Sequence, residues 1–127
     1  MKTVGIAGPA GPERAALVEA LVRELAGRGL SVSTVKEAPE GFEFDKPGKD
    51  SFRHREAGAQ EVLIASDSRW ALVGEGEAPL ARLEPVDVVM IEGERAEAEL
   101  TLSLVHPLLR AGDVKAITDF VVTRLSI

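Results

Sequence analysis

The hydrophobic positions of this chain form short runs and one long helical stripe. An apolar run at residues 4–7 is typical of a strand buried on both faces. Over residues 13–28 the apolar positions recur every three or four residues, which predicts an amphipathic helix that ends before Gly29. Residues 31–36 alternate in the β-branched manner of a strand. Because strand, helix and strand follow in this order, the pattern predicts a βαβ unit and a parallel sheet.

Shorter elements are expected in the rest of the chain. They are a surface loop at 37–47, a helix at 51–57 capped by Asp50, hairpin strands at 61–66 and 69–73, a helical turn at 79–83, strands at 86–91, 100–105 and 114–118, and a helix at 120–125 capped by Asp119. The predicted fold is therefore α/β, with a mostly parallel sheet flanked by helices and an additional antiparallel hairpin. We expect one domain over residues 1–127.

Composition narrows the functional classes. The net charge of −6 argues against a general nucleic-acid binder, which needs a concentrated basic surface. The absence of cysteine excludes thiol chemistry. No run is long enough to span a bilayer, so we expect a cytoplasmic protein that makes no membrane contact. The sequence has no Asn, one Gln and twice as many Arg as Lys, which is compatible with a thermophilic source.

The turn between the first strand and the first helix has the frame of a phosphate-binding loop. Such a loop follows the pattern G-x-x-x-x-G-K-[ST], in which backbone amides and the lysine bind phosphate and the hydroxyl binds Mg²⁺. Gly8 and Gly11 are present, but Glu13, Arg14 and Ala15 stand at the second glycine, the lysine and the hydroxyl. Two readings stay open, a structural turn without nucleotide affinity and a weakened or altered anion site at the helix N-terminus.

A basic cluster follows in the second quarter of the chain. It consists of Lys46, Lys49, Arg53 and Arg55 with His54 among them. By its charge pattern it is either a site for an anionic ligand or a solvated loop and helix face.

The remaining candidate functional residues are two carboxylates and the single tryptophan. Asp87 and Glu92 stand at the two ends of an apolar run, and a carboxylate that follows a buried strand can hold Mg²⁺ or orient a water. Trp70 is expected to be a core or interface aromatic.

Four segments together resemble the molybdopterin-guanine dinucleotide biosynthesis protein B (MobB) family. They are TVK at residues 34–36, DKPGKDSFRHREAGA at 45–59, RWAL at 69–72 and DVVMIEG at 87–93. The resemblance implies a P-loop NTPase-like fold, a homodimer, binding of GTP and Mg²⁺, and a partner in the guanylyltransferase that joins GMP to molybdopterin. Molybdopterin itself is an alternative ligand.

The site residues follow from this resemblance and from the basic cluster. Those predicted to bind the cofactor are Gly8, Gly11, Arg14, Ala15, Lys36, Lys46, Lys49, Asp50, Arg53 and Glu92, with Asp50 and Glu92 as metal ligands. Three departures from the family pattern fall on the nucleotide side: the altered loop, Glu37 where the family has histidine, and Glu94-Arg95 where it has an aromatic residue and lysine.

The leading hypothesis is an accessory protein of molybdenum cofactor synthesis, a dimeric adaptor with weak or lost GTP binding and no assigned catalytic residue. One alternative is a GTPase in which Arg14 replaces the lysine. The other is a protein-interaction module that uses the basic cluster.

Overall fold

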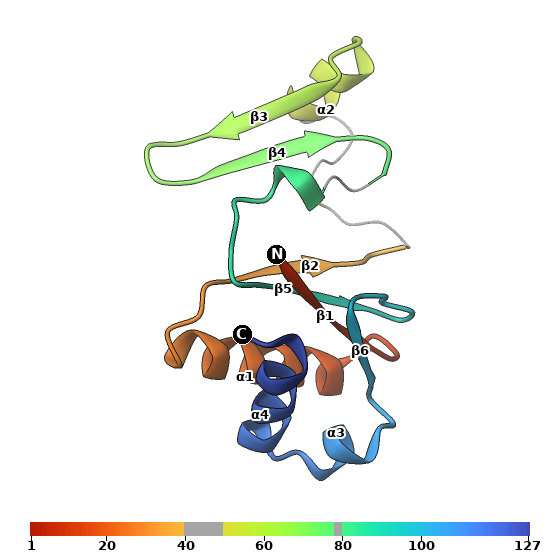
Figure 1. The fold of residues 1–127 in the computed structure, drawn as a ribbon. Helices are drawn as coiled ribbons and strands as arrows, with labels where there is room; N and C mark the ends of the chain where they lie inside the picture. The colour runs from red at the N-terminus through yellow and green to blue at the C-terminus, as the bar shows by residue number, and fades with distance from the viewer. Residues whose placement is uncertain (40–49, 78–79) are drawn as a thin grey trace. The chain divides into compact units, whose positions relative to one another are not determined.

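The computed structural model describes residues 1–39, 50–77 and 80–127. The chain forms two compact units, Met1–Ala38 with Leu83–Ile127, and Pro39–Arg82 (Figure 1). Each unit is described by itself, and the single domain expected over residues 1–127 stays a prediction. Within the described ranges, no helix is long and apolar enough to cross a membrane.

The first unit is an α/β layer. Its elements are β1 (Lys2–Ala7), α1 (Pro12–Gly27), β2 (Val32–Lys36), β5 (Val88–Gly93), β6 (Leu100–Ser103), α3 (Pro107–Ala111) and α4 (Val114–Leu125). The four strands pair in the order β2-β5-β1-β6, and all three pairings are parallel. The predicted βαβ unit and parallel sheet are thus confirmed, with β5 inserted between the first two strands.

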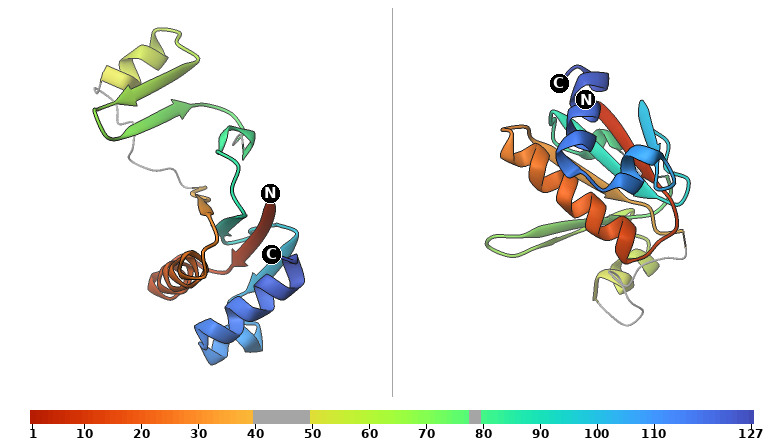
Figure 2. Two further views of the ribbon diagram at one scale, coloured as in Figure 1. Left: turned by 60° about the vertical axis from the view of Figure 1, so that its left-hand side comes forward. Right: turned by 90° about the horizontal axis from the view of Figure 1, so that it is seen from below.

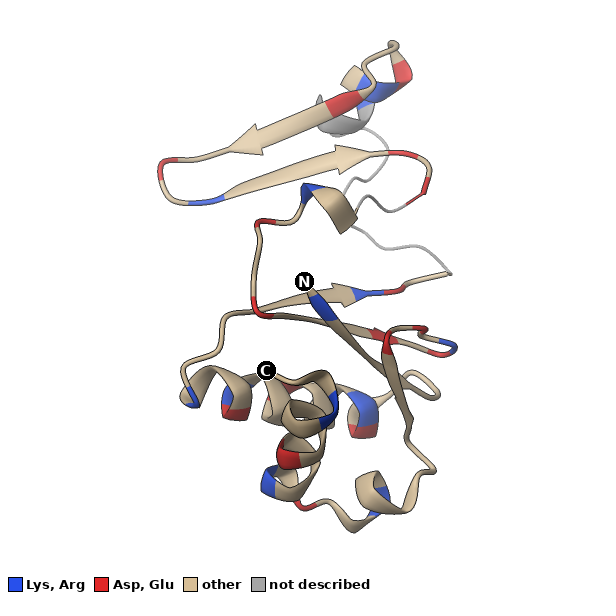
Figure 3. Cartoon of the chain, in the orientation of Figure 1, with Lys and Arg blue, Asp and Glu red and all other residues tan. Residues whose placement is uncertain are grey.

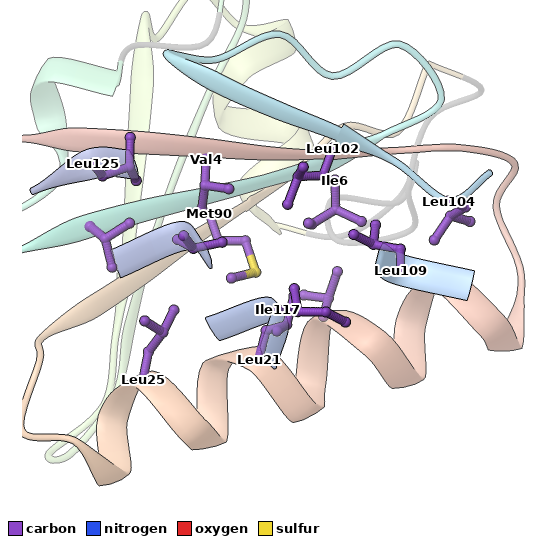
Figure 4. Packing of buried hydrophobic residues seen from close by; sticks show 13 residues of the cluster. Val4, Ile6, Leu21, Leu25, Met90, Leu102, Leu104, Leu109, Ile117 and Leu125 are labelled. Atoms are coloured by element: carbon purple, nitrogen blue, oxygen red, sulfur yellow. The ribbon is translucent and has the colours of Figure 1, made fainter. Parts of the chain in front are cut away.

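Helices α1 and α4 lie side by side against one face of this sheet (Figure 2). The apolar stripe of α1 buries Val18, Leu21 and Leu25 there. Figure 4 shows Leu21 and Leu25 of this helix turned toward the same core as Val4 and Met90 from the strands. Burial of this stripe is what holds the helix on the sheet, because isolated helices of this length are marginal in water.

The predicted strand at residues 114–118 is wrong, because these residues begin helix α4. Asp113 caps that helix by accepting a hydrogen bond from the amide of Ala116 at 3.1 Å. Asp119, expected as the cap, lies inside the helix. The four-residue spacing of Ile117 and Val121, both buried, selects a helix because it turns them into the same core.

The second unit is built on a hairpin. Its described elements are α2 (Asp50–Glu56), β3 (Glu61–Ala65), β4 (Trp70–Gly74) and the 3-10 turn Leu80–Arg82. Strands β3 and β4 pair antiparallel, as predicted. Trp70 is 70% exposed, so its placement in the core is wrong, whereas its role at an interface stays a prediction.

Candidate functional site

The glycine loop joins β1 to α1 at the carboxyl edge of the sheet. Gly8 has a φ of +156°, and a Cβ at this residue would stand 2.5 Å from Cδ1 of Leu104. Its amide donates to the carbonyl of Gly93 at 3.2 Å, which ties the loop to the end of β5. Glycine is therefore required at residue 8 both by the backbone conformation and by the close approach of Leu104.

Arg14, at the position of the phosphate-binding lysine, is turned into the protein. Only 4% of its side chain is exposed. Its Nε donates to Oε2 of Glu92 at 3.1 Å, and its Nη1 donates to the carbonyl of Gly8 at 2.9 Å. Helical side chains lean toward the helix N-terminus, and this brings a residue of the first turn back onto the strand ends. Arg14, Glu92 and Gly8 are thus brought together as the resemblance predicts, but they bind one another.

The end of β2 adjoins this contact. Lys36 stands in register with Glu92 and is exposed. The amide of Glu37 donates to the carbonyl of Glu92 at 2.9 Å, and the Glu37 side chain occupies the space that a side chain at Gly93 would need. An acidic residue therefore covers the end of β5.

The remaining loop positions offer little to a nucleotide. Glu13 and Ala15 are exposed. The Ala15 amide donates a hydrogen bond to the carbonyl of Gly11 at 3.1 Å and so is not available to a phosphate. Pro12 at the first helical position has no amide hydrogen, and no side chain caps the helix. Residues 8–15 of the loop therefore supply neither the lysine nor the hydroxyl of the GTP-site pattern.

Among the described residues, the predicted Mg²⁺ ligands are also not arranged as a metal site. Glu92 is 13% exposed and its carboxylate is engaged by Arg14. The described residues contain no group of three or more acidic, histidine or cysteine side chains able to hold a metal. The side chain of Asp50 lies outside the described set.

A cavity of about 410 Å³ lies beside the loop. It is lined by Pro9, Ala10, Gly11, Pro12, Glu13, Leu104, Val105 and Arg110. Neither Leu104 nor Arg110 was predicted as a site residue. Leu104 falls in the strand predicted at 100–105, and α3, which carries Arg110, was not predicted. The available signal for that helix was Pro107, its first residue, together with Gly112, its C-cap.

The basic cluster belongs to the other unit. Arg53 and Arg55 lie on α2, and Nη1 of Arg55 contacts Oε1 of Glu75 at 2.7 Å. Lys46 and Lys49 fall outside the described residues. Their role in binding stays a prediction.

Asp87 stands at the amino edge of the sheet, away from Glu92. Its Oδ2 accepts hydrogen bonds from the amide of Ser31 at 2.8 Å and from its hydroxyl at 3.0 Å. These bonds, the backbone one first, lower the pKa of the Asp87 carboxyl. The two carboxylates at the ends of the apolar run therefore do not share a site, and Asp87 joins β2 to β5.

Comparison with known proteins shows which family this chain belongs to. The model of the family described as molybdopterin guanine dinucleotide synthesis protein B matches residues 3–121. Two proteins named molybdopterin-guanine dinucleotide biosynthesis adapter protein are similar in sequence, one from Haemophilus influenzae at 35% identity over 102 residues and one from Escherichia coli at 33% over 97 residues. These matches cover 74% and 68% of this chain. The chain spans only 57% and 55% of the length of these curated relatives.

A solved structure supports the fold. The crystal structure of a molybdopterin-guanine biosynthesis protein B matches with a TM-score of 0.68 at 20% identity, covering 97% of this chain and 99% of that one. With the family match over nearly all of its length, the chain belongs to the molybdopterin guanine dinucleotide synthesis protein B family, whose P-loop NTPase-like fold it shares.

Proposed function

We propose that this chain is an adaptor in molybdopterin-guanine dinucleotide synthesis that works without turning over GTP. The observation that carries the proposal is the contact between Arg14 and Glu92 in a member of this family. It engages the two charged groups expected to meet the γ-phosphate and the metal, while Ala15 has no hydroxyl for Mg²⁺. What supports the adaptor role is the name shared by both curated relatives.

The proposed partner is the guanylyltransferase that joins GMP to molybdopterin. Removal of the protein from its own cells is expected to lower the amount of guanylated cofactor, and the wild-type chain is expected to restore it. The measurement is the cofactor content of purified molybdoenzymes. Unchanged cofactor levels after removal would contradict the pathway assignment. A cytoplasmic location and a thermophilic source stay predictions.

The nucleotide part of the proposal is tested separately, by calorimetric titration of the purified protein with GTP and Mg²⁺. We expect no binding in the micromolar range and no hydrolysis. Binding at low micromolar concentration together with release of phosphate would contradict it. A titration with molybdopterin in place of GTP tests the alternative ligand.

A functioning GTPase in which Arg14 replaces the lysine is disfavoured by the burial of that side chain. A guanidinium that is 4% exposed and hydrogen-bonded at two nitrogens must leave both partners before it can meet a phosphate. Should any nucleotide bind, Arg14→Ala discriminates the two readings. An unchanged affinity would exclude a direct role for the arginine.

We also propose that the adaptor is a homodimer, with the hairpin as the contact. One face of β3 and β4 carries Leu63, Trp70 and Leu72, which are 63%, 70% and 40% exposed. Figure 3 shows the charged residues of the hairpin gathered toward the strand ends and the turn, so the middle of each strand is uncharged. A hairpin with an apolar face is marginal alone. Among the described residues β3 and β4 pair only with each other, so an edge of the hairpin is available for the same strand of a second copy.

The hairpin contact is tested by the mass of Trp70→Glu in light scattering. A charge at this position is expected to convert a dimer into a monomer. Val105→Glu is the matched control, because Val105 is equally exposed at 71% but lies outside the hairpin. If Trp70→Glu keeps the mass of the wild type, the hairpin is not the contact.

The interaction-module alternative has its own readout. Salt-sensitive capture of an acidic protein through Arg53 and Arg55, with no guanylyltransferase among the partners, would favour it.

A further inference from the structure

The contact between Arg14 and Glu92 also holds three pieces of backbone together. Through Nη1 the guanidinium reaches the carbonyl of Gly8 at the start of the loop, and through Nε it reaches Glu92 at the end of β5. Arg14 itself belongs to the first turn of α1. One side chain therefore connects the beginning of the loop, the helix that follows it and the neighbouring strand.

The burial of this contact makes it costly to open. The exposed fractions are 4% for Arg14 and 13% for Glu92. A buried charge is tolerated only while it is paired, and removal of one partner leaves the other charge uncompensated. A polyphosphate that approached the loop would have to compete with an intramolecular carboxylate already in place.

We propose that the Arg14–Glu92 pair is an internal lock that replaces the phosphate and metal of a bound nucleotide and holds the glycine loop in a single ligand-free conformation. The lock deepens the proposed function and rests on its nucleotide-independent part. Arg14 acts in it as a positioning residue, since it works through the backbone of the loop. In this chain the loop is therefore folded before any partner binds and does not cycle with a nucleotide.

Three backbone hydrogen bonds surround the lock and serve as probes. The amide of Gly8 donates to Gly93, the amide of Ala15 to Gly11, and the amide of Glu37 to Glu92. At the opposite edge of the same sheet, the amide of Val88 donates to the carbonyl of Ser31 at 3.2 Å and serves as the internal reference.

The experiment is amide hydrogen exchange of the purified full chain, followed by NMR. In Glu92→Gln we expect the probe amides at Gly8 and Glu37 to exchange roughly tenfold faster than in the wild type, with the Val88 amide unchanged. Glu13→Gln is the matched control, because it removes the carboxylate of the residue next to Arg14, and the Glu13 side chain is exposed. It is expected to leave all of these rates within about twofold of the wild type.

A double-mutant cycle keeps the proposal testable if a single variant is poorly folded. Arg14→Met with Glu92→Met removes both charges, and replacement of a whole buried pair by apolar residues is far less harmful than loss of one partner. We expect the double variant to be better protected at Gly8 than either single variant. Additive effects of the two substitutions, or equal acceleration at Gly8 and Val88, would overturn the lock.

Inorganic tripolyphosphate provides a second readout. Breaking the lock releases the charge of Arg14, so Glu92→Gln is expected to bind tripolyphosphate at least about tenfold more tightly than either the wild type or Glu13→Gln. Equal affinity of Glu13→Gln and Glu92→Gln would overturn the proposal, because it would mean that only the net charge of the loop matters. The adaptor role fails separately, in the cofactor content of cells, so the two failures are distinguishable.

Discussion

The two edges of the four-stranded sheet hold their charges in different ways. At the carboxyl edge, Arg14 of α1 is buried and contacts Glu92. At the other end of the same helix, Arg28 is 30% exposed and contacts Glu24 at 3.2 Å and Asp119 at 2.7 Å. Both places pair an arginine with carboxylates, but the arginine is buried at Arg14 and partly exposed at Arg28.

Because of this difference, the buried contact of Arg14 fixes the glycine loop, whereas the exposed contacts of Arg28 constrain the structure little. Exposed ion pairs contribute little because water and salt screen them and because long side chains lose entropy when they are held. A buried pair contributes little when compared with an apolar replacement, but loss of one partner is severe. In a P-loop fold, ligands bind at the carboxyl ends of the strands. The buried pair of Arg14 and Glu92 lies at that same end of the sheet, where a nucleotide-binding protein would leave the site open.

The largest expected effect comes from Arg14→Met. It leaves Glu92 as an unpaired buried carboxylate, and we expect the free energy of unfolding to fall by about 3 to 5 kcal/mol. The measurement is urea unfolding, with Arg28→Met as the matched substitution at the other end of α1. Equal midpoints for the two variants would remove the distinction between the edges.

The glycine loop sharpens the same comparison at the level of the backbone. Gly8 and Gly11 share a φ of +156°, but a Cβ would collide with Leu104 only at Gly8, whereas the space at Gly11 is open. Gly8→Ala is expected to lower the free energy of unfolding by roughly 2 to 3 kcal/mol, and Gly11→Ala by about 1 to 2 kcal/mol, since it carries the backbone strain alone. Urea midpoints measure both. A larger effect at Gly11 would mean that Leu104 moves aside and that the loop is less rigidly held than the lock requires.

Much of this fold can be predicted from the sequence because local patterns and tertiary packing agree there. The apolar runs that became β1 and β5 and the stripe of α1 are buried as their periodicity predicts. At residues 114–118 they disagree, because the β-branched residues there are typical of a strand while the Asp113 cap and the core positions of α4 require a helix.

The candidate site was predictable only in its position. The glycine frame and the acidic strand end locate the carboxyl edge, and the family resemblance identifies both segments. Nothing in the spacing shows that Arg14 and Glu92, 78 residues apart, bind each other, because that contact depends on how a helix and a strand meet. The resemblance assigns each residue to a ligand, whereas the structure shows them satisfying each other.

The amino edge can be tested through pH. The pKa of Asp87 is lowered by its hydrogen bonds from Ser31, so its contribution to stability is present above the ordinary carboxyl pKa and is lost as the pH falls through the lowered value. We expect Asp87→Asn to reduce stability at neutral pH and to have less effect in acid, where the wild type loses the same contribution. Urea midpoints at neutral pH and at about pH 3 measure this difference. A constant gap between variant and wild type would show that the charge of Asp87 is not what joins β2 to β5.

The smallest effect is expected for Asp119→Ala. Its hydrogen bond to Arg28 is the main cause that raises the pKa of that guanidinium, but Arg28 is charged at every accessible pH, so the raised pKa itself adds no pH dependence to stability. Both side chains are solvated, and the effect is expected to be far smaller than that of Arg14→Met and to vanish in about 0.5 M salt. Glu19→Ala, which removes the more exposed contact with Arg23, is the control and should have no measurable effect. If Asp119→Ala proved as harmful as Arg14→Met, and remained so in salt, burial would not be what distinguishes the two edges, and the constraint on the glycine loop would need another cause.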